Sequence, residues 1–201
     1  SNSIAPTNPP KISKAIDITL IVGDIVENKT FASCVVSLNG IGINDNKAFI
    51  TAFSSLKTNN TSISAMLSKA YSEISWYYGS NKEKFLNNAK AMELKGNFDE
   101  AIAYLMSVPP IDDICYQTCQ DYAIEVYKSK VKSKSVEAYL SAKAAWVGDK
   151  SKRGAYIALP FLKQVNPASE CYTDALALWD EISDKLDADE IEAKEIAKAK
   201  Y

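Results

Sequence analysis

Histidine is missing from the 201-residue chain, and arginine is nearly so. Without histidine the chain lacks the usual general base, the usual proton shuttle and the most common metal ligand, so any catalysis has to rest on other groups. Of the 23 basic residues, 22 are lysines and Arg153 is the exception. Because nucleic-acid recognition favours arginine forks for phosphate and guanine, this balance, at a net charge of -2, argues against nucleic-acid binding.

Long apolar runs are also missing. No stretch approaches the roughly 20 apolar residues that a membrane-spanning helix needs, and no basic and apolar leader opens the sequence. A Ser-Asn start without Met predicts a trimmed end, so localisation stays open, with a cytoplasmic or virion setting favoured. The 47% hydrophobic composition is enough to bury the core of one or two compact domains.

The four cysteines do not indicate a small disulfide-rich domain, because a chain of this length has ample apolar residues for a core. Cys115 and Cys119 are four residues apart, so on a helix a metal ion could bridge them. Zinc would need two further ligands, which without histidine must be thiolates or carboxylates. Both cysteines share an apolar stripe with Tyr122 and Val126, which favours buried thiols. We therefore predict no metal site and no cofactor.

The first 60 residues predict a β-hairpin with a covering helix. Residues 1–12 contain three prolines and no periodicity, which predicts an extended lead-in. Two alternating apolar runs, separated by VENKT, then predict two long strands in residues 13–60. The alternating residues are Ile16, Ile18, Leu20 and Val22, then Ala32, Cys34, Val36 and Leu38. A lone hairpin is marginal in water, so we expect it to pack on a helix or to complete a larger sheet.

After the second strand the apolar spacing changes to about 3.6 residues, which predicts a helix that covers the hairpin. Asn44 or Asp45 can cap this helix. The preceding LNGIG lacks the third glycine and the Lys-Ser/Thr pair of a phosphate loop, so Asn39-Gly40 is predicted to be an ordinary turn.

From residue 61 to 201 the pattern is helical throughout. Residues 62–95 predict either one helix or two helices joined near Gly79. We favour one bent helix, because a single exposed glycine costs only about 1 kcal/mol relative to Ala. Gly96 ends this helix, and Asn97 with Glu100 predicts a capping box for a short helix. The predicted fold class is therefore α+β and mainly α, with about five helices after the hairpin and its covering helix.

An internal repeat organises this helical part. The segment NAKAMELKGNFDEAIAYLMSVPPIDDICYQ can be laid over SAKAAWVGDKSKRGAYIALPFLKQVNPASECYT, about 55 residues later. The matches are Ala89-Lys90-Ala91 with Ala142-Lys143-Ala144, Gly96 approximately with Gly148, Leu105 with Leu162, Val108 with Val165, Pro110 with Pro167, and Cys115-Tyr116 with Cys171-Tyr172. We infer units at about 62–112 and 113–168 and a terminal helix at 169–200, each unit being a long helix, a glycine turn, a short helix and a proline loop.

The first unit resembles a tetratricopeptide repeat (TPR). Gly96, Phe98 and Ala101 are similar to the turn glycine, the aromatic residue and the small residue at the helix crossing of that family, and NFDEAI looks like the start of a second repeat helix. The chain departs from the family because Pro109 cuts this helix short, the period is about 55 instead of about 34, and Gly154 stands about where alanine is expected. The resemblance implies a TPR-like antiparallel helical array and does not carry peptide binding with it.

The order of parts also resembles that of uncharacterised proteins of gut Bacteroidetes and their tailed bacteriophages, in which a hairpin and a helix precede a TPR-like half. The residues that carry this likeness are Gly23-Asp24, Phe31-Ala32-Ser33, Leu38, Gly40, Gly42 and Lys47-Ala48. The likeness brings no established activity. It implies a structural or interaction role in a virion or a cell envelope.

Two segments supply candidate contacts for a partner. In SWYYG, three consecutive large side chains cannot all face one core, so at least one is expected at a rim, where Trp and Tyr suit a contact; core packing is the alternative. In YKSKVKSKS, the lysines pair 128 with 132 and 130 with 134 along a predicted helix, and a solvated helix face is the plain interpretation. The candidate contacts are Trp76, Tyr77, Tyr78, Lys128, Lys132, Lys152 and Arg153.

Charge is distributed unevenly along the helical part. Residues 127–153 are basic, whereas the last 32 residues carry ten acids against four lysines. Such polarity can orient a protein partner or a second copy of the chain.

These patterns predict a non-enzymatic interaction or structural protein, with its contacts on the helical half and no evident small-molecule substrate. One alternative is the binding of nucleic acid or another anionic partner through residues 128–153. A weaker alternative is a carboxylate-based enzyme, which needs two acids that converge in a pocket with raised pKa values. The acids considered, Asp99, Glu100, Asp112 and Asp113, fall instead at predicted helix caps and exposed faces.

Overall fold

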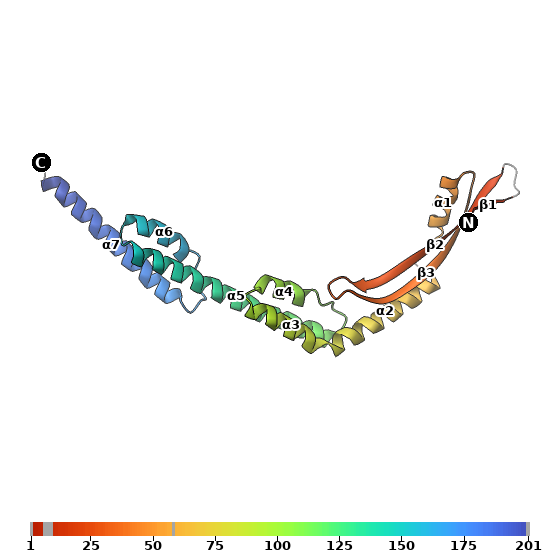
Figure 1. The fold of residues 1–201 in the computed structure, drawn as a ribbon, viewed down its shortest axis with the longest axis horizontal. Helices are drawn as coiled ribbons and strands as arrows, with labels where there is room; N and C mark the ends of the chain where they lie inside the picture. The colour runs from red at the N-terminus through yellow and green to blue at the C-terminus, as the bar shows by residue number, and fades with distance from the viewer. Residues whose placement is uncertain (1, 6–9, 58, 200–201) are drawn as a thin grey trace. The chain divides into compact units, whose positions relative to one another are not determined.

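The computed structural model describes residues 2–5, 10–57 and 59–199, and in them it confirms the predicted α+β, mainly α architecture (Figure 1). An antiparallel β-hairpin packs on helices and is followed by further helices. In chain order the described elements are β1 (Asn2–Ala5), β2 (Lys11–Asp24), β3 (Lys29–Gly42), α1 (Asp45–Ser54), α2 (Thr61–Ser80), α3 (Lys82–Leu94), α4 (Phe98–Met106), α5 (Asp113–Gly148), α6 (Lys152–Leu162) and α7 (Tyr172–Ala199).

The chain divides into two compact units. Unit 1 comprises residues 1–88 and 103–120, and unit 2 comprises residues 89–102 and 121–201. Within the described ranges, no helix is both long and apolar enough to cross a membrane.

The predicted hairpin consists of β2 and β3, joined by a turn at residues 25–28. Its register pairs Ile16 with Leu38 and Ile18 with Val36, so both alternating apolar runs point to one face. Helix α1 covers one end of this face with Ala52, and α2 covers the other with Met66. Strand β1 pairs with residues 11–14 and adds a third strand inside the predicted lead-in, of which residues 1 and 6–9 lie outside the described chain.

Helix α1 begins where predicted, because the Asn44 side chain accepts a hydrogen bond from the backbone N–H of Lys47 at 2.9 Å. The prediction of a turn at Asn39-Gly40 was wrong, since both residues continue β3 to Gly42. A Cβ on Gly40 would lie 2.1 Å from the Ala48 carbonyl oxygen. The glycine is therefore needed so that α1 can approach the strand closely.

The predicted single helix over residues 62–95 is interrupted at Asn81, which separates α2 from α3. The Asn81 side chain donates to the Tyr77 carbonyl oxygen at 2.8 Å, and its backbone carbonyl accepts from the Lys84 N–H at 2.9 Å. Asn81 thus ends one helix and begins the next. Gly79, the expected weak point, remains helical.

The glycine turn between α3 and α4 is present as predicted. Gly96 has a φ of +80°, a conformation that suits glycine, and the Asn97 N–H reaches back to the Met92 carbonyl oxygen at 3.0 Å. The Asn97 side chain donates to Glu100 at 3.0 Å, which differs from the predicted capping box, in which Asn97 would accept from the backbone.

Several positions that the internal repeat matches are buried in both repeats. The buried pairs at matched positions are Ala89 and Ala142, Leu105 and Leu162, Val108 and Val165, Cys119 and Ala175, and Val126 and Ile182. With Leu105 matched to Leu162, the counterpart of Ala101 is Ala158, and both are fully buried. The predicted counterpart Gly154 was therefore misplaced; a Cβ there would lie 1.7 Å from the Asp149 carbonyl oxygen, so Gly154 is needed by the loop before α6.

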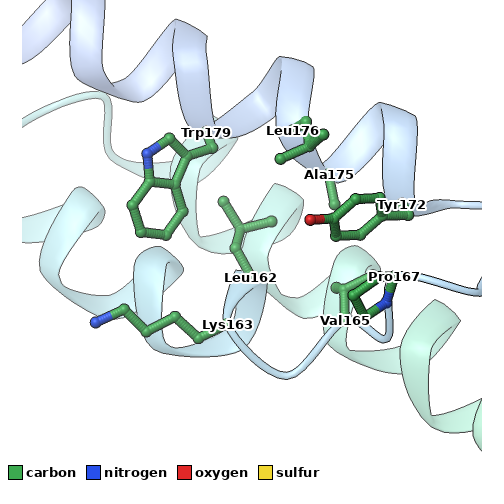
Figure 2. A pocket seen from close by; sticks show the side chains of 8 residues that line it. All are labelled: Leu162, Lys163, Val165, Pro167, Tyr172, Ala175, Leu176 and Trp179. Atoms are coloured by element: carbon green, nitrogen blue, oxygen red, sulfur yellow. The ribbon is translucent and has the colours of Figure 1, made fainter.

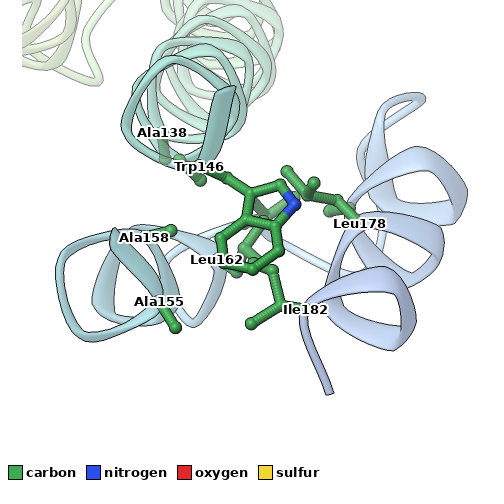
Figure 3. Packing of buried hydrophobic residues seen from close by; sticks show 10 residues of the cluster. Ala138, Trp146, Ala155, Ala158, Leu162, Leu178 and Ile182 are labelled. Carbon is green, nitrogen blue, oxygen red and sulfur yellow. The ribbon is translucent and has the colours of Figure 1, made fainter. Parts of the chain in front are cut away.

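The core of unit 2 forms where the C-terminal part of α5 meets α6 and α7 (Figure 3). Trp146 of α5 lies among Leu162 of α6 and Leu178 and Ile182 of α7. Its indole N–H donates to Glu181 at 2.9 Å, so the buried ring keeps its polar atom satisfied. Alanines on α5 and α6 allow these helices to approach closely.

Candidate protein-interaction surfaces

The three aromatic candidates of SWYYG divide between surface and core. Trp76 is 66% exposed on α2 and stays available for a contact. Tyr77 and Tyr78 are 9% and 1% exposed, so the prediction that they contact a partner needs correction. Their rings pack against each other and against Phe85, and their hydroxyls donate to carboxylates of the hairpin tip, which we define as residues Asp24 to Lys29.

The hairpin tip is held in unit 1 by a cluster of hydroxyl donors around two acids. Glu27, whose side chain is 7% exposed, accepts hydrogen bonds from the hydroxyls of Tyr77 at 2.6 Å and Tyr104 at 3.0 Å and forms an ion pair with Lys84. Asp24 accepts from the Tyr78 hydroxyl. The tip is therefore tied to α2, α3 and the end of α4 that belongs to unit 1.

Aromatic rings support the same cluster. Tyr78 stacks on Phe85 with ring centroids 5.0 Å apart, and Phe85 packs beside Tyr104 at 5.8 Å. The Lys29 ammonium lies 3.9 Å from the centroid of the Tyr77 ring, a cation–π geometry. These contacts enclose the hydroxyls that face the acids.

The electrostatics of the cluster favour ionised acids. Burial raises the pKa of Glu27, but hydrogen bonds from Lys84, Tyr77 and Tyr104 outweigh it and hold this pKa below its usual value. Burial likewise raises the pKa of Asp24, but hydrogen bonds from Tyr78 and from backbone N–H groups outweigh it and hold this pKa below its usual value. Burial raises the pKa of Tyr78, so this hydroxyl remains a donor. These two acids lie close together with lowered pKa values, whereas a general acid needs a raised one.

Sequence reasoning missed Asp24, Glu27, Lys84 and Tyr104. The tip acids belong to a turn that looks like an ordinary polar turn in the sequence. The residues that bind them lie 50 to 77 positions further along the chain: Tyr77, Tyr78, Lys84 and Tyr104. No local pattern links such positions. The only signal was the tyrosine pair itself, whose hydroxyls require partners once the rings are buried.

The lysine candidates of unit 2 lie at the surface, and several meet acids. Lys128 pairs with Glu125 and Lys132 with Glu170, each at 2.8 Å. Exposed ion pairs of this kind contribute little to stability, about 0–1 kcal/mol. They do reduce the net positive charge offered to an anionic partner. Lys152 and Arg153 lie exposed in the first turn of α6.

A surface cavity adjoins the lysine pair. Tyr127, Lys128, Val131 and Lys132 of α5 line a cavity of about 450 Å³ together with the loop at residues 166–170. Of the predicted contacts, the structure brings Lys128 and Lys132 together in one recess. Lys152 and Arg153 do not line it.

An apolar groove runs between α6 and α7 in unit 2 (Figure 2). Its volume is about 370 Å³. Figure 2 shows Tyr172 and Trp179 of α7 on either side of Leu162 of α6, with Lys163 at the edge. The lining residues are Leu162, Lys163, Val165, Pro167, Tyr172, Ala175, Leu176 and Trp179. Sequence reasoning placed the contacts on this half but did not identify the groove.

Cys115 and Cys119 are buried thiols, as the apolar stripe predicts. Burial raises the pKa of Cys115 to about 12, so the thiol stays protonated at neutral pH. Across the described residues, no three or more Cys, Asp or Glu side chains come together in a way that could hold a metal ion.

Comparison of the chain with protein families, with curated proteins and with solved structures gives no match in any of the three.

Proposed function

We propose that this chain is a non-enzymatic interaction or scaffold protein that binds a protein partner through the helices of unit 2. The observation that carries the proposal is the apolar groove between α6 and α7. Leu176 is 47% exposed on its wall, although the neighbouring Leu178 of the same helix is buried in the core. An exposed apolar recess of this kind suits the side chains of a partner.

The proposed setting is a virion or a cell envelope. It is supported by the resemblance of the chain to uncharacterised proteins of gut Bacteroidetes and their tailed bacteriophages.

Affinity capture from the native lysate or particles tests this proposal. The full chain serves as bait beside its variant Leu176→Glu, which puts a charge on the groove wall. We expect the wild-type chain to retain virion or envelope proteins and the variant to lose them. Ala177→Glu, one residue along on an exposed position, is the matched control and should retain them. If both variants captured the same amount of partner protein, the groove would not be the binding site.

A second candidate function is the binding of an anionic partner through residues 128–153. The cavity beside Lys128 and Lys132 supports it. Retention on heparin that falls as salt rises, and that Lys128→Gln with Lys132→Gln abolishes, is the expected result. Absence of retention at low salt would refute it.

A further inference from the structure

Unit 2 contains a counterpart of the site that holds the hairpin tip in unit 1. The repeat matches α3 to α5 at an offset of 53 residues, as for Ala89 and Ala142, and α4 to α6 at an offset of 57, as for Leu105 and Leu162. At these offsets six residues at α3 and α4 have the following counterparts: Asn81 with Lys134, Lys84 with Glu137, Phe85 with Ala138, Asn88 with Ser141, Tyr104 with Phe161, and Ser107 with Gln164. Tyr77 and Tyr78, which also bind the tip, correspond to Lys130 and Val131 and have no counterpart in this set.

These six counterparts line one cavity in unit 2. Lys134, Glu137, Ala138, Ser141, Phe161 and Gln164 enclose about 250 Å³ at the surface. In unit 1 the tip fills the corresponding position, where Lys84 and Tyr104 bind Glu27 directly. The same surface of the repeat is thus covered in unit 1 and open in unit 2, within the part of the chain that the structure describes.

The substitutions between the two sites make space in the second. Ala138 replaces the ring of Phe85, which in unit 1 packs against Tyr104. Phe161 replaces Tyr104 without its hydroxyl and is 36% exposed, because no tip covers it. An apolar floor remains where the first site offers a hydroxyl donor.

The charges of the second site are rearranged as well. The cation of the first site, Lys84, has an acid, Glu137, as its counterpart, and the cation now stands three residues earlier, at Lys134. Three residues of a helix correspond to about 4.5 Å. A complementary segment therefore presents a carboxylate to Lys134, a basic side chain to Glu137 and an apolar group to Phe161.

We propose that this cavity is a docking site for a hairpin turn of a partner protein, which carries a carboxylate beside a basic side chain. This inference rests on the proposed interaction function and names its site and the chemistry of the partner. The chain's own tip is a turn of this kind, with Asp24, Glu27 and Lys29 within six residues, and it binds Lys84 and Tyr104 at the corresponding surface of unit 1. The tip of a second copy is already bound in its own unit 1 through Asp24 and Glu27, so the occupant is a different protein.

A cyclised hairpin peptide that copies residues 20–33 is the probe, because it carries both acids and the lysine. Anisotropy of the labelled peptide measures its binding to the full chain. We expect one peptide per chain and at least a tenfold loss of affinity with Lys134→Glu. The peptide variant Glu27→Lys should recover part of that loss on the Lys134→Glu chain, as expected of a direct charge contact. Tyr156→Asp, at an exposed position of α6 outside the cavity, is the control and should leave affinity unchanged.

Two results would overturn the docking site: no binding of the peptide, or equal affinity for wild-type chain and Lys134→Glu. Different results would refute the proposed function: the full chain captures no protein, or the Leu176→Glu variant captures the same proteins as the wild type. A chain that loses its captured partner with Leu176→Glu but never binds the turn peptide would refute this site and leave the interaction function standing.

Discussion

Replacing Glu27 by glutamine tests the cluster that holds the hairpin tip. The substitution keeps the shape of the side chain but removes its charge. One carbonyl oxygen remains and can serve one tyrosine, so about one hydrogen bond to a charged acceptor is lost, worth about 1.5–3 kcal/mol. The Lys84 side chain is 46% exposed, so loss of its ion pair adds at most about 1 kcal/mol. We expect unit 1 to lose about 2–3 kcal/mol of stability at pH 7.

The effect should depend on pH with a definite sign. The pKa of Glu27 in the folded chain lies below its usual value, so its contribution is complete above the unfolded pKa of about 4.3 and is lost as pH falls through the folded pKa. The difference between wild type and Glu27→Gln should therefore shrink as the pH is lowered from about 5.

Native-state hydrogen exchange of the β2 and β3 amides, followed as a function of urea concentration, measures the stability of unit 1 separately from that of unit 2. Glu73→Gln is the control, because Glu73 is an exposed acid on α2, and it should change the stability by less than about 0.5 kcal/mol. A Glu27→Gln chain as stable as the control at pH 7, or a difference that grows on acidification, would refute the role assigned to this carboxylate.

Three further predictions concern packing and thiol reactivity. Gly40→Ala should weaken the docking of α1 by about 1–3 kcal/mol in urea unfolding, because its Cβ meets helix backbone, whereas Gly148→Ala, with open space around it, should be neutral or slightly stabilising. Ile182→Ala should lower the stability of unit 2 by about 2–5 kcal/mol, and a smaller loss in thermal or urea unfolding would contradict its place in the core. At pH 8, iodoacetamide should label Cys115 far more slowly than the half-buried Cys34, since burial raises the pKa of Cys115 to about 12; equal rates by mass spectrometry would contradict this.

The hairpin and its covering helix could be predicted because their signals are local. Alternation along both strands defines the buried face. Asn44 marks the start of α1 through a hydrogen bond from Lys47, only three positions further along the chain. The interruption at Asn81 could not be predicted in the same way. It depends on an asparagine side chain that binds the backbone of the preceding turn, and such a residue is also tolerated on an exposed helix face.

The contacts of the tip were beyond local patterns for another reason. A turn that contains Asp24 and Glu27 is chemically ordinary, and its burial follows only once tertiary structure brings Tyr77 and Tyr104 to it. The same applies to the groove between α6 and α7. Leu162 and Leu176 look alike in sequence, yet the first is buried and the second forms an exposed wall.

The two repeats are identical at several core positions and differ at two positions that contact Glu27 of the tip in unit 1. Leu105 and Leu162 are identical and buried, as are Val108 and Val165. Next to them, Lys84 corresponds to Glu137 and Tyr104 to Phe161, and both changes fall on the surface that the tip covers in unit 1. If that surface in unit 2 were merely solvated, polar residues would serve equally well at each of these positions. Phe161 instead places a partly exposed apolar ring beside Lys134 and Glu137, which is the combination that the proposed docking site requires.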